Sequence, residues 1–150
     1  EYHGDGPGIK SNRPCLFVQL EIGIMSGTRV FLNGKIHRAK VTQADMNYVG
    51  SVSIDRDLMD AAGISEWEKV AVLDVTNGSR LETYAITAPR GSREICINGA
   101  AAHLVRPGDI VIILSYIHLD ANSSENHVPK IVIVDNENKI SKIIDHESNF

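Results

Sequence analysis

The segment Val70–Ile86, VAVLDVTNGSRLETYAI, decides the fold that this sequence predicts. Two runs rich in strand-forming residues, Val70–Val75 and Leu81–Ile86, flank the dipeptide Asn77-Gly78. Asn-Gly between such runs is a strong short-range signal of a β-hairpin, because both residues tolerate the positive φ angles of a tight turn. The segment therefore predicts two strands that pair through a turn.

Further short strands, separated by turn residues, are expected on both sides of this hairpin at Ile36–Val41, Val52–Ile54, Glu94–Ile97, Ile110–Tyr116 and Ile131–Val134. This pattern favours a mainly β domain over an α/β one. Short helices are expected at Asp57–Ala62, which Gly63 ends, and at Ala100–Leu104. The run Ile110–Leu114 lacks polar alternation, which predicts a strand buried on both faces.

A weak internal repeat relates two parts of the chain. Ala61-Ala62 is followed by the run at 70–72, and forty positions later Ala101-Ala102 is followed by a similar run at 110–112. Equal spacing in both copies indicates two halves packed about a pseudo-twofold axis.

Composition limits the classes of partner and compartment. A chain of 150 residues fits one domain, and its 19 acidic and 15 basic residues are interspersed, without a basic stripe that would favour nucleic acid. The apolar stretch Leu16–Met25 is too short and too polar to span a membrane. Two cysteines, Cys15 and Cys96, cannot form a disulfide framework, which is typical of a reducing cytoplasm.

The segment Tyr48-Val49-Gly50-Ser51-Val52 carries the chemistry of greatest interest. A serine hydroxyl that attacks the preceding carbonyl turns the amide into an ester, elimination gives dehydroalanine, and hydrolysis of dehydroalanine gives a pyruvoyl group. Glycine at position 50 leaves its carbonyl unhindered and tolerates unusual backbone angles. On its own, Gly-Ser is a common turn dipeptide, so the prediction depends on the residues around it.

Four further blocks accompany this segment, in the order Gly34-Lys35-Ile36-His37-Arg38, Asn77-Gly78-Ser79-Arg80, Glu82-Thr83-Tyr84 and Asn98-Gly99-Ala100-Ala101-Ala102-His103. In order and spacing the five blocks resemble those of the aspartate alpha-decarboxylases, self-cleaving pyruvoyl enzymes that make beta-alanine for pantothenate synthesis. The resemblance runs from about Val30 to about Asp135. It implies a double-psi β-barrel with short helices, L-aspartate as substrate, and a homotetramer with active sites at subunit interfaces.

The resemblance also implies which residues carry out self-processing. Ser51 would be the precursor of the pyruvoyl group, and the chain would divide between Gly50 and Ser51. Thr83 resembles the threonine that hydrogen-bonds at the processing site, and Tyr48 would orient the segment or line the pocket. By composition alone, Ser51 could instead satisfy a turn and Thr83 could simply fill a strand.

Catalysis requires an acceptor for the electrons that remain when carbon dioxide leaves. A pyruvoyl group forms a Schiff base with the substrate amine and takes up those electrons, so no pyridoxal phosphate is expected. By resemblance Tyr84 returns a proton, while Arg80 and Lys35 bind the substrate carboxylate. Asn98 offers its amide to the new group, and the backbone of Gly99, Ala100 and Ala101 shapes the pocket.

These residues also have ordinary alternatives, because a hairpin arginine, a surface lysine and a strand tyrosine are common in any β domain. We give His37 a supporting role only. The histidines show no metal-binding spacing, and neither Cys-x-x-Cys nor His-Glu-x-x-His occurs, so no metal is expected.

Two other functions stay open. Arg80 selects a carboxylate but cannot fix the length of the substrate, so the chain could be a pyruvoyl decarboxylase of another small acidic amino acid. It could also be a non-catalytic β-barrel interaction module whose Gly50-Ser51 is only a turn.

The chain is expected to have three parts. Residues 1–26, rich in glycine and proline, would be a leader that is appended or poorly ordered, and Met25 could be the natural start. Residues 27–136 would form the decarboxylase barrel. The C-terminal tail, 137–150, alternates charged residues with isoleucine and would form an edge strand or remain disordered.

Overall fold

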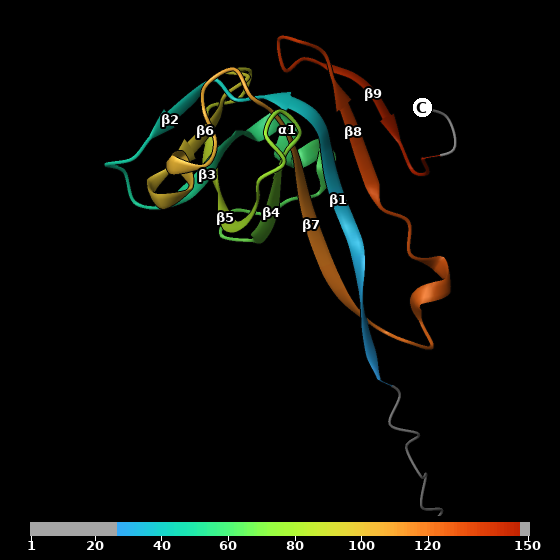
Figure 1. Cartoon of the computed structure of the whole chain (residues 1–150). Coiled ribbons are helices and arrows are strands. Elements are labelled where there is room, and N and C mark those ends of the chain that lie inside the picture. Colours follow the sequence, from blue (N-terminus) through green and yellow to red (C-terminus); the bar gives the residue numbers. More distant parts are fainter. Residues whose placement is uncertain (1–26, 148–150) are drawn as a thin grey trace, which may run out of the picture.

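The computed structural model describes residues 27–147, so the expected leader and Cys15 lie outside the described residues. The structure is mainly β with short helices, as the sequence predicts (Figure 1). Its strands are β1 (Thr28–Lys40), β2 (Gln43–Asp45), β3 (Ser51–Asp55), β4 (Lys69–Asp74), β5 (Arg80–Ala88), β6 (Ile95–Asn98), β7 (Ile110–Asp120), β8 (Lys130–Val134) and β9 (Ile140–Ile144). Its helices are α1 (Arg56–Ala62) and two 3₁₀ turns, η1 (Gly99–His103) and η2 (Ser124–Asn126).

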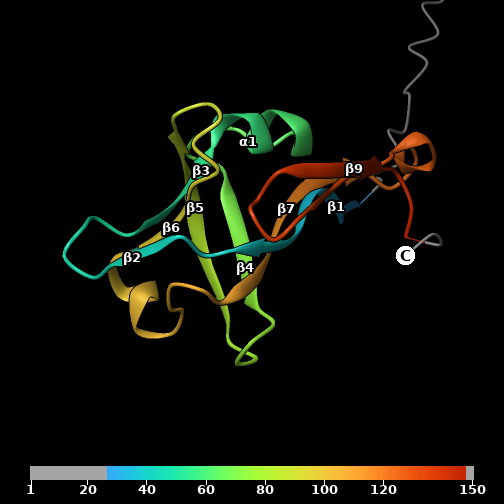
Figure 2. The same cartoon turned by 90° about the horizontal axis from the view of Figure 1, so that it is seen from above.

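The strands form one mixed sheet in the order β2-β6-β3-β5-β4-β7-β1-β8-β9. The chain itself links β1 to β2, the first strand of this order, through Val41 and Thr42. The backbone N–H of Val41 donates to Asp109 O before β7, and that of Thr42 donates to Ile95 O in β6, each at 2.9 Å. These links are consistent with a β-barrel, and β8 and β9 lie on the side away from β2 and β6 in both views (Figure 2).

Alternating aliphatic side chains form the core. On β4 and on residues 110–115 of β7 every second residue is buried, as with Val72 and Ile113, and Val52 of β3 is likewise fully buried. A strand places successive side chains on opposite faces, so this alternation directs one face of each strand inward. Burial of each such side chain contributes about 1.5–3 kcal/mol. Helix α1 adds Leu58, Met59 and Ala62 to the core.

The internal repeat is visible in the strand pairing. Strands β3 and β4, which flank α1, pair antiparallel with β6 and β7, which flank η1. Antiparallel pairing between equivalent strands of two copies is what a pseudo-twofold axis between them requires. The predicted repeat therefore corresponds to the two halves that make up the central strands.

Most of the predicted strands are confirmed, but several ends differ. Strand β1 begins at Thr28 rather than Ile36, because its whole first part pairs with β7 as far as Thr28 opposite Asp120. Strand β7 is buried on one face only, since Ile112 and Leu114 are half-buried, so the prediction of burial on both faces is wrong. The second helix is a 3₁₀ turn at Gly99–His103 instead of Ala100–Leu104.

One strand was not predicted, and another had been only one of two alternatives. Strand β2 consists of three residues that pair in parallel with β6. Strand β9 lies at the sheet edge and pairs antiparallel with β8, so the edge-strand alternative for the C-terminal stretch is the one the structure shows over Ile140–Ile144.

The hairpin predicted at Asn77-Gly78 is formed by β4 and β5, which pair antiparallel. Its loop is held by the buried Asp74, whose Oδ1 accepts the backbone N–H of Thr76 at 2.8 Å and of Asn77 at 3.2 Å. Gly78 takes φ 81°, the left-handed conformation that favours glycine at this point. The loop therefore delivers Arg80 to the start of β5 in a fixed position.

The opposite pKa shifts of Asp74 and Asp109 predict that the two carboxyl groups share a proton. Oδ2 of Asp74 is buried and has no donor within residues 27–147 unless Asp74 itself is protonated and donates to the Asp109 carboxylate. Burial, followed by the contact with Asp109, raises the pKa of Asp74, while the same contact lowers the pKa of Asp109. The pair therefore holds a single negative charge over the pH range between the two pKa values.

We expect this pair to make stability depend on pH. A raised folded-state pKa contributes stability below the ordinary aspartate pKa, and that contribution is lost as the pH rises through the raised value. Asp74→Asn keeps a side-chain donor toward Asp109 but has no carboxyl proton to lose. The free energy of unfolding of this variant should therefore not fall as the pH rises through the raised pKa of Asp74. Urea unfolding at several pH values from about 4 to about 8, spanning the range above the ordinary aspartate pKa, measures this. Glu125→Gln, which removes an exposed carboxylate, serves as control. If the free energy of unfolding changed equally with pH in the wild-type protein and in both variants, the shared proton would be contradicted.

Candidate active site

Ser51 is the first residue of β3 and is buried, with 1% of its surface exposed. It lies directly opposite Asn98, the last residue of β6, in the antiparallel register. The Asn98 side-chain amide Nδ2 donates a hydrogen bond to Ser51 Oγ at 2.9 Å. A buried strand hydroxyl with a buried side-chain donor differs from the exposed turn serine that composition alone would suggest.

The amide of Asn98 is oriented by two residues that the sequence prediction missed. Cys96 Sγ donates to Asn98 Oδ1 at 3.2 Å, and Asn98 Nδ2 donates also to Ser53 Oγ at 3.1 Å. Burial, with smaller effects from Glu94 and Asp45, raises the pKa of the Cys96 thiol, which therefore keeps the proton that it donates. Ser53 and Cys96 are paired across β3 and β6, and a single sequence carries no signal of such a register.

Gly99 packs directly against the backbone of Gly50. A Cβ at Gly99 would lie 2.7 Å from Gly50 Cα, 2.9 Å from Gly50 N and 3.2 Å from Tyr48 O, and Gly99 has φ 69°. Both the close approach and the backbone conformation therefore require glycine. Gly50 does not adopt the left-handed conformation, and a Cβ there would meet only Asn98 O at 3.9 Å. The tight packing therefore lies at Gly99.

Two of the three proposed residues on β5, Thr83 and Tyr84, lie close to Ser51 in the register. Val52 of β3 pairs in parallel with Ala85 of β5, and both are buried in the core. Tyr84 precedes Ala85 by one position, as Ser51 precedes Val52, so alternation places both on the other face of the sheet. Thr83 is half-buried, and its hydroxyl makes no hydrogen bond with any residue in the range 27–147.

Tyr48 contributes its backbone to the site, while its side chain is exposed. Ala100 and Ala101 follow Gly99 in η1, where Ala100 is exposed and Ala101 is half-buried. The structure therefore gathers Tyr48, Gly50, Ser51, Asn98 and Gly99 at one place, with η1 beside them.

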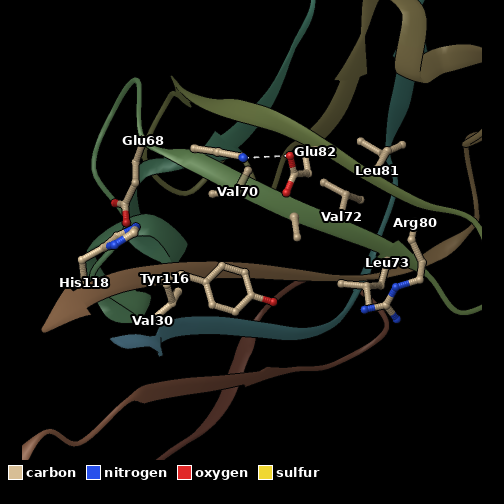
Figure 3. Close-up of a pocket in the computed structure, with 12 residues that line it drawn as sticks. Val30, Glu68, Val70, Val72, Leu73, Arg80, Leu81, Glu82, Tyr116 and His118 are labelled. Carbon is tan, nitrogen blue, oxygen red and sulfur yellow. Dashed lines mark ion pairs between the residues drawn. The ribbon is translucent and has the colours of Figure 1, made fainter. Parts of the chain in front are cut away.

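Arg80 lines a separate cavity of about 770 Å³ on the outer face of β4, β5 and β7. Its guanidinium has no ion-pair partner among the described residues, and it lies at the opposite end of the cavity from Glu68 and His118 (Figure 3). Glu82, between these ends, forms an ion pair with Lys69 at 2.8 Å. Ser51 does not line this cavity.

Lys35 and His37 lie on β1, away from the β3 to β6 pair in the sheet order. The largely buried Lys35 ammonium forms an ion pair with Glu147 at 2.6 Å. Burial, and then the positive charges of Lys35 and Arg38, lower the pKa of His37, while Glu147 acts in the opposite direction. The imidazole is therefore neutral at pH 7 and offers no positive charge to a carboxylate.

Residues 27–147 contain no group of three or more His, Cys, Asp or Glu side chains placed to hold a metal ion. Within the same range, no helix is long and apolar enough to cross a membrane.

Comparisons with known proteins identify the family of this chain. The model of the aspartate decarboxylase family matches residues 27–141. Aspartate 1-decarboxylase of Neisseria meningitidis serogroup C is 57% identical over 119 residues, which cover 79% of this chain and 94% of the relative. The Corynebacterium efficiens enzyme of the same name is 58% identical over 112 residues, 75% of this chain and 82% of the relative. That of Clostridium beijerinckii is 53% identical over 118 residues, 79% of this chain and 95% of the relative. The chain therefore belongs to the aspartate decarboxylase family.

Proposed function

We propose that this chain cleaves itself between Gly50 and Ser51 and decarboxylates L-aspartate to beta-alanine and carbon dioxide, supplying pantothenate and coenzyme A synthesis. The observation that carries the proposal is the buried Ser51 Oγ, held by Asn98 Nδ2 at 2.9 Å next to a glycine carbonyl. Family membership supports the substrate, because the relatives are named aspartate 1-decarboxylases.

The residues around Ser51 fit a pyruvoyl group. The hydrogen bond from Asn98 provides an uncharged donor, and the backbone of Gly99 leaves no space for a Cβ between it and Gly50. A small planar group without a charge suits such a site, since uncharged donors satisfy a carbonyl oxygen without a counter-ion. Asn98, Gly99 and the 3₁₀ turn that follows would hold the group. When formed, it accepts the electrons released by loss of carbon dioxide.

The chain's own residues would carry out self-processing, bind the substrate and return the proton. During processing, attack of Ser51 Oγ on the Gly50 carbonyl forms an ester, elimination leaves a carboxylate on Gly50, and addition of one water with loss of ammonia completes the conversion of residue 51. Thr83 would hydrogen-bond at this site once the segment moves to react. In catalysis Tyr84 would return the proton, and Arg80, supported by Lys35, would bind the substrate carboxylate.

The separation of these groups supports an assembly of several copies, which the family resemblance implies is a homotetramer. Arg80 lines a cavity that does not include Ser51, and Lys35 lies on β1 beyond β4 and β7 in the sheet order. We therefore include in the proposal an active site completed by a second copy of the chain. The division into a leader at 1–26, a barrel at 27–136 and a tail, together with a cytoplasmic location, stays part of the same proposal.

Arg80 provides the test of substrate class. Aspartate should have a higher kcat/KM than glutamate or cysteine sulfinate, and Arg80→Gln should lower kcat/KM for aspartate by about 30-fold, the effect of losing one charged hydrogen-bond partner. Cleavage at residue 50 should be unchanged in this variant. Higher turnover of another acid would favour the alternative of a different acidic substrate, and no turnover of any acid by a wild-type chain that stays intact would favour a non-catalytic module.

A further inference from the structure

The turn after α1 places a large aromatic residue where the backbone disfavours it. In the four-residue turn Ser65–Glu68, Glu68 N donates to Ser65 O at 3.2 Å, and Ser65 N donates to a Glu68 carboxylate oxygen at 2.7 Å. Trp67, the third residue of the turn, has φ 69°. Turns with a positive φ at this position favour glycine or asparagine, so the backbone alone does not account for a tryptophan.

Burial does not account for a tryptophan at position 67 either. Trp67 is 70% exposed and is the only tryptophan of the sequence. A side chain that keeps most of its surface in water gains little from the hydrophobic effect. A glycine or asparagine would relieve the backbone, and little core packing would be lost.

The contact that distinguishes Trp67 is with Tyr84. The two rings are stacked, with centroids 5.7 Å apart and an angle of 21° between their planes. This is the range of an offset stack, in which one ring restricts the rotation of the other. The Tyr84 hydroxyl makes no hydrogen bond to a residue of the described part of the chain, so the stack is the specific contact that orients this side chain there.

Hydrogen bonds connect the turn Ser65–Glu68 to β5, the strand that carries Tyr84. Trp67 N donates to Ala85 O at 2.8 Å, and Ala85 N donates to Glu68 O at 2.9 Å. Thr87 N donates to Glu66 Oε1 at 3.3 Å. Because these bonds lie on the residues that follow Tyr84 in β5, the indole is held at a fixed position relative to the phenol.

We propose that Trp67 is a positioning residue, which holds the Tyr84 ring so that its free hydroxyl faces the substrate carbon that must be protonated. The inference rests on the proposed role of Tyr84 as proton donor. A tyrosine ring that is held by stacking, and whose hydroxyl makes no hydrogen bond, can transfer a proton without first breaking such a bond. Proton transfer depends strongly on geometry, so a loosely held phenol should slow that step more than it weakens substrate binding.

The first test does not depend on activity. With tyrosines labelled by ¹³C at the ε carbons, the Tyr84 signal, assigned from its loss in Tyr84→Phe, should be shifted by the indole ring current. Trp67→Gly should remove this shift. Arg93→Gly is the matched control, because Arg93 also has a positive φ, 59°, and does not stack on a tyrosine. An unshifted Tyr84 signal in the parent protein would overturn the proposal.

The second test is a kinetic double-mutant cycle. Trp67→Gly should lower kcat about tenfold, a fraction of what a general acid contributes, with KM changed by less than about twofold. Self-cleavage should be unaffected, and stability against urea equal or higher. In the Tyr84→Phe background the same substitution should have no further effect on kcat. Arg93→Gly should leave kcat and KM unchanged.

The outcomes separate this inference from the proposed function. If Tyr84→Phe lowers kcat but Trp67→Gly does not, or if the two effects add, Trp67 does not act through Tyr84 and the inference is overturned. If Tyr84→Phe leaves kcat unchanged, both the proton-donor role and the positioning role are wrong, while self-cleavage and decarboxylation stand on their own measurements.

Discussion

Ser51→Ala is expected to yield an intact chain that does not decarboxylate aspartate. Without Oγ there is no nucleophile for the Gly50 carbonyl and no source of the pyruvoyl group, so the protein lacks both cleavage and its electron acceptor. The loss should be on the order of 10⁶-fold or reach the detection limit, as when a covalent catalyst is removed. Electrophoresis under denaturing conditions and an assay for carbon dioxide release measure the two effects.

The sequence supplies matched controls for this result. Gly-Ser occurs three times, at residues 50–51, 78–79 and 91–92. Only Ser51 of the three is buried, whereas Gly78 and Gly91 have positive φ angles in turns. Ser92→Ala should therefore be cleaved at residue 50 and remain active. Activity in a homogeneous Ser51→Ala preparation would show that the pyruvoyl hypothesis is wrong.

Gly99→Ala should have the next largest effect, on the rate of self-cleavage. Its Cβ would lie 2.7 Å from Gly50 Cα, and alanine disfavours the φ of 69° that this residue adopts. The segment before Ser51 must then move, and a displacement of about 1 Å costs a positioned reaction about 100-fold or more in rate. The time course of fragment formation after purification of the precursor measures this loss.

Gly50→Ala is the control for Gly99→Ala. A Cβ at residue 50 would meet only Asn98 O, at 3.9 Å, and Gly50 lacks the left-handed conformation. It should therefore slow cleavage much less than the change at Gly99. The reverse order would mean that freedom of the Gly50 backbone, and not the packing of Gly99, controls the reaction.

The strands that could be predicted are those whose own residues determine them. Alternating aliphatic residues indicated β4 and β5, and Asn77-Gly78 indicated their turn, because these signals act within a few residues. Strand β2 has only three residues and exists because β6 lies beside it. The half-buried face of β7 and the start of β1 likewise depend on pairing partners far away in the sequence.

The candidate site could likewise be predicted only where its residues belong to recognisable sequence blocks. The Gly50-Ser51 bond and Asn98 could be found from their blocks, and the register places Ser51 opposite Asn98. The thiol of Cys96, which turns the Asn98 amide toward Ser51, and the stacking of Trp67 on Tyr84 could not be found. The first contact joins residues two positions apart in β6 and the second joins a turn to β5, and the sequence contains no local pattern that indicates either. Glycine was expected to matter at residue 50, but the close contact falls on Gly99, which packs against it.

Mass measurement of the denatured wild-type protein tests self-cleavage most directly. We expect two fragments, residues 1–50 and 51–150, with the second lighter by one ammonia than a product of simple hydrolysis. That second fragment should also form an adduct with a hydrazine, which traps ketones. A chain that stays intact after prolonged incubation, while the preparation decarboxylates aspartate, would contradict self-cleavage between Gly50 and Ser51.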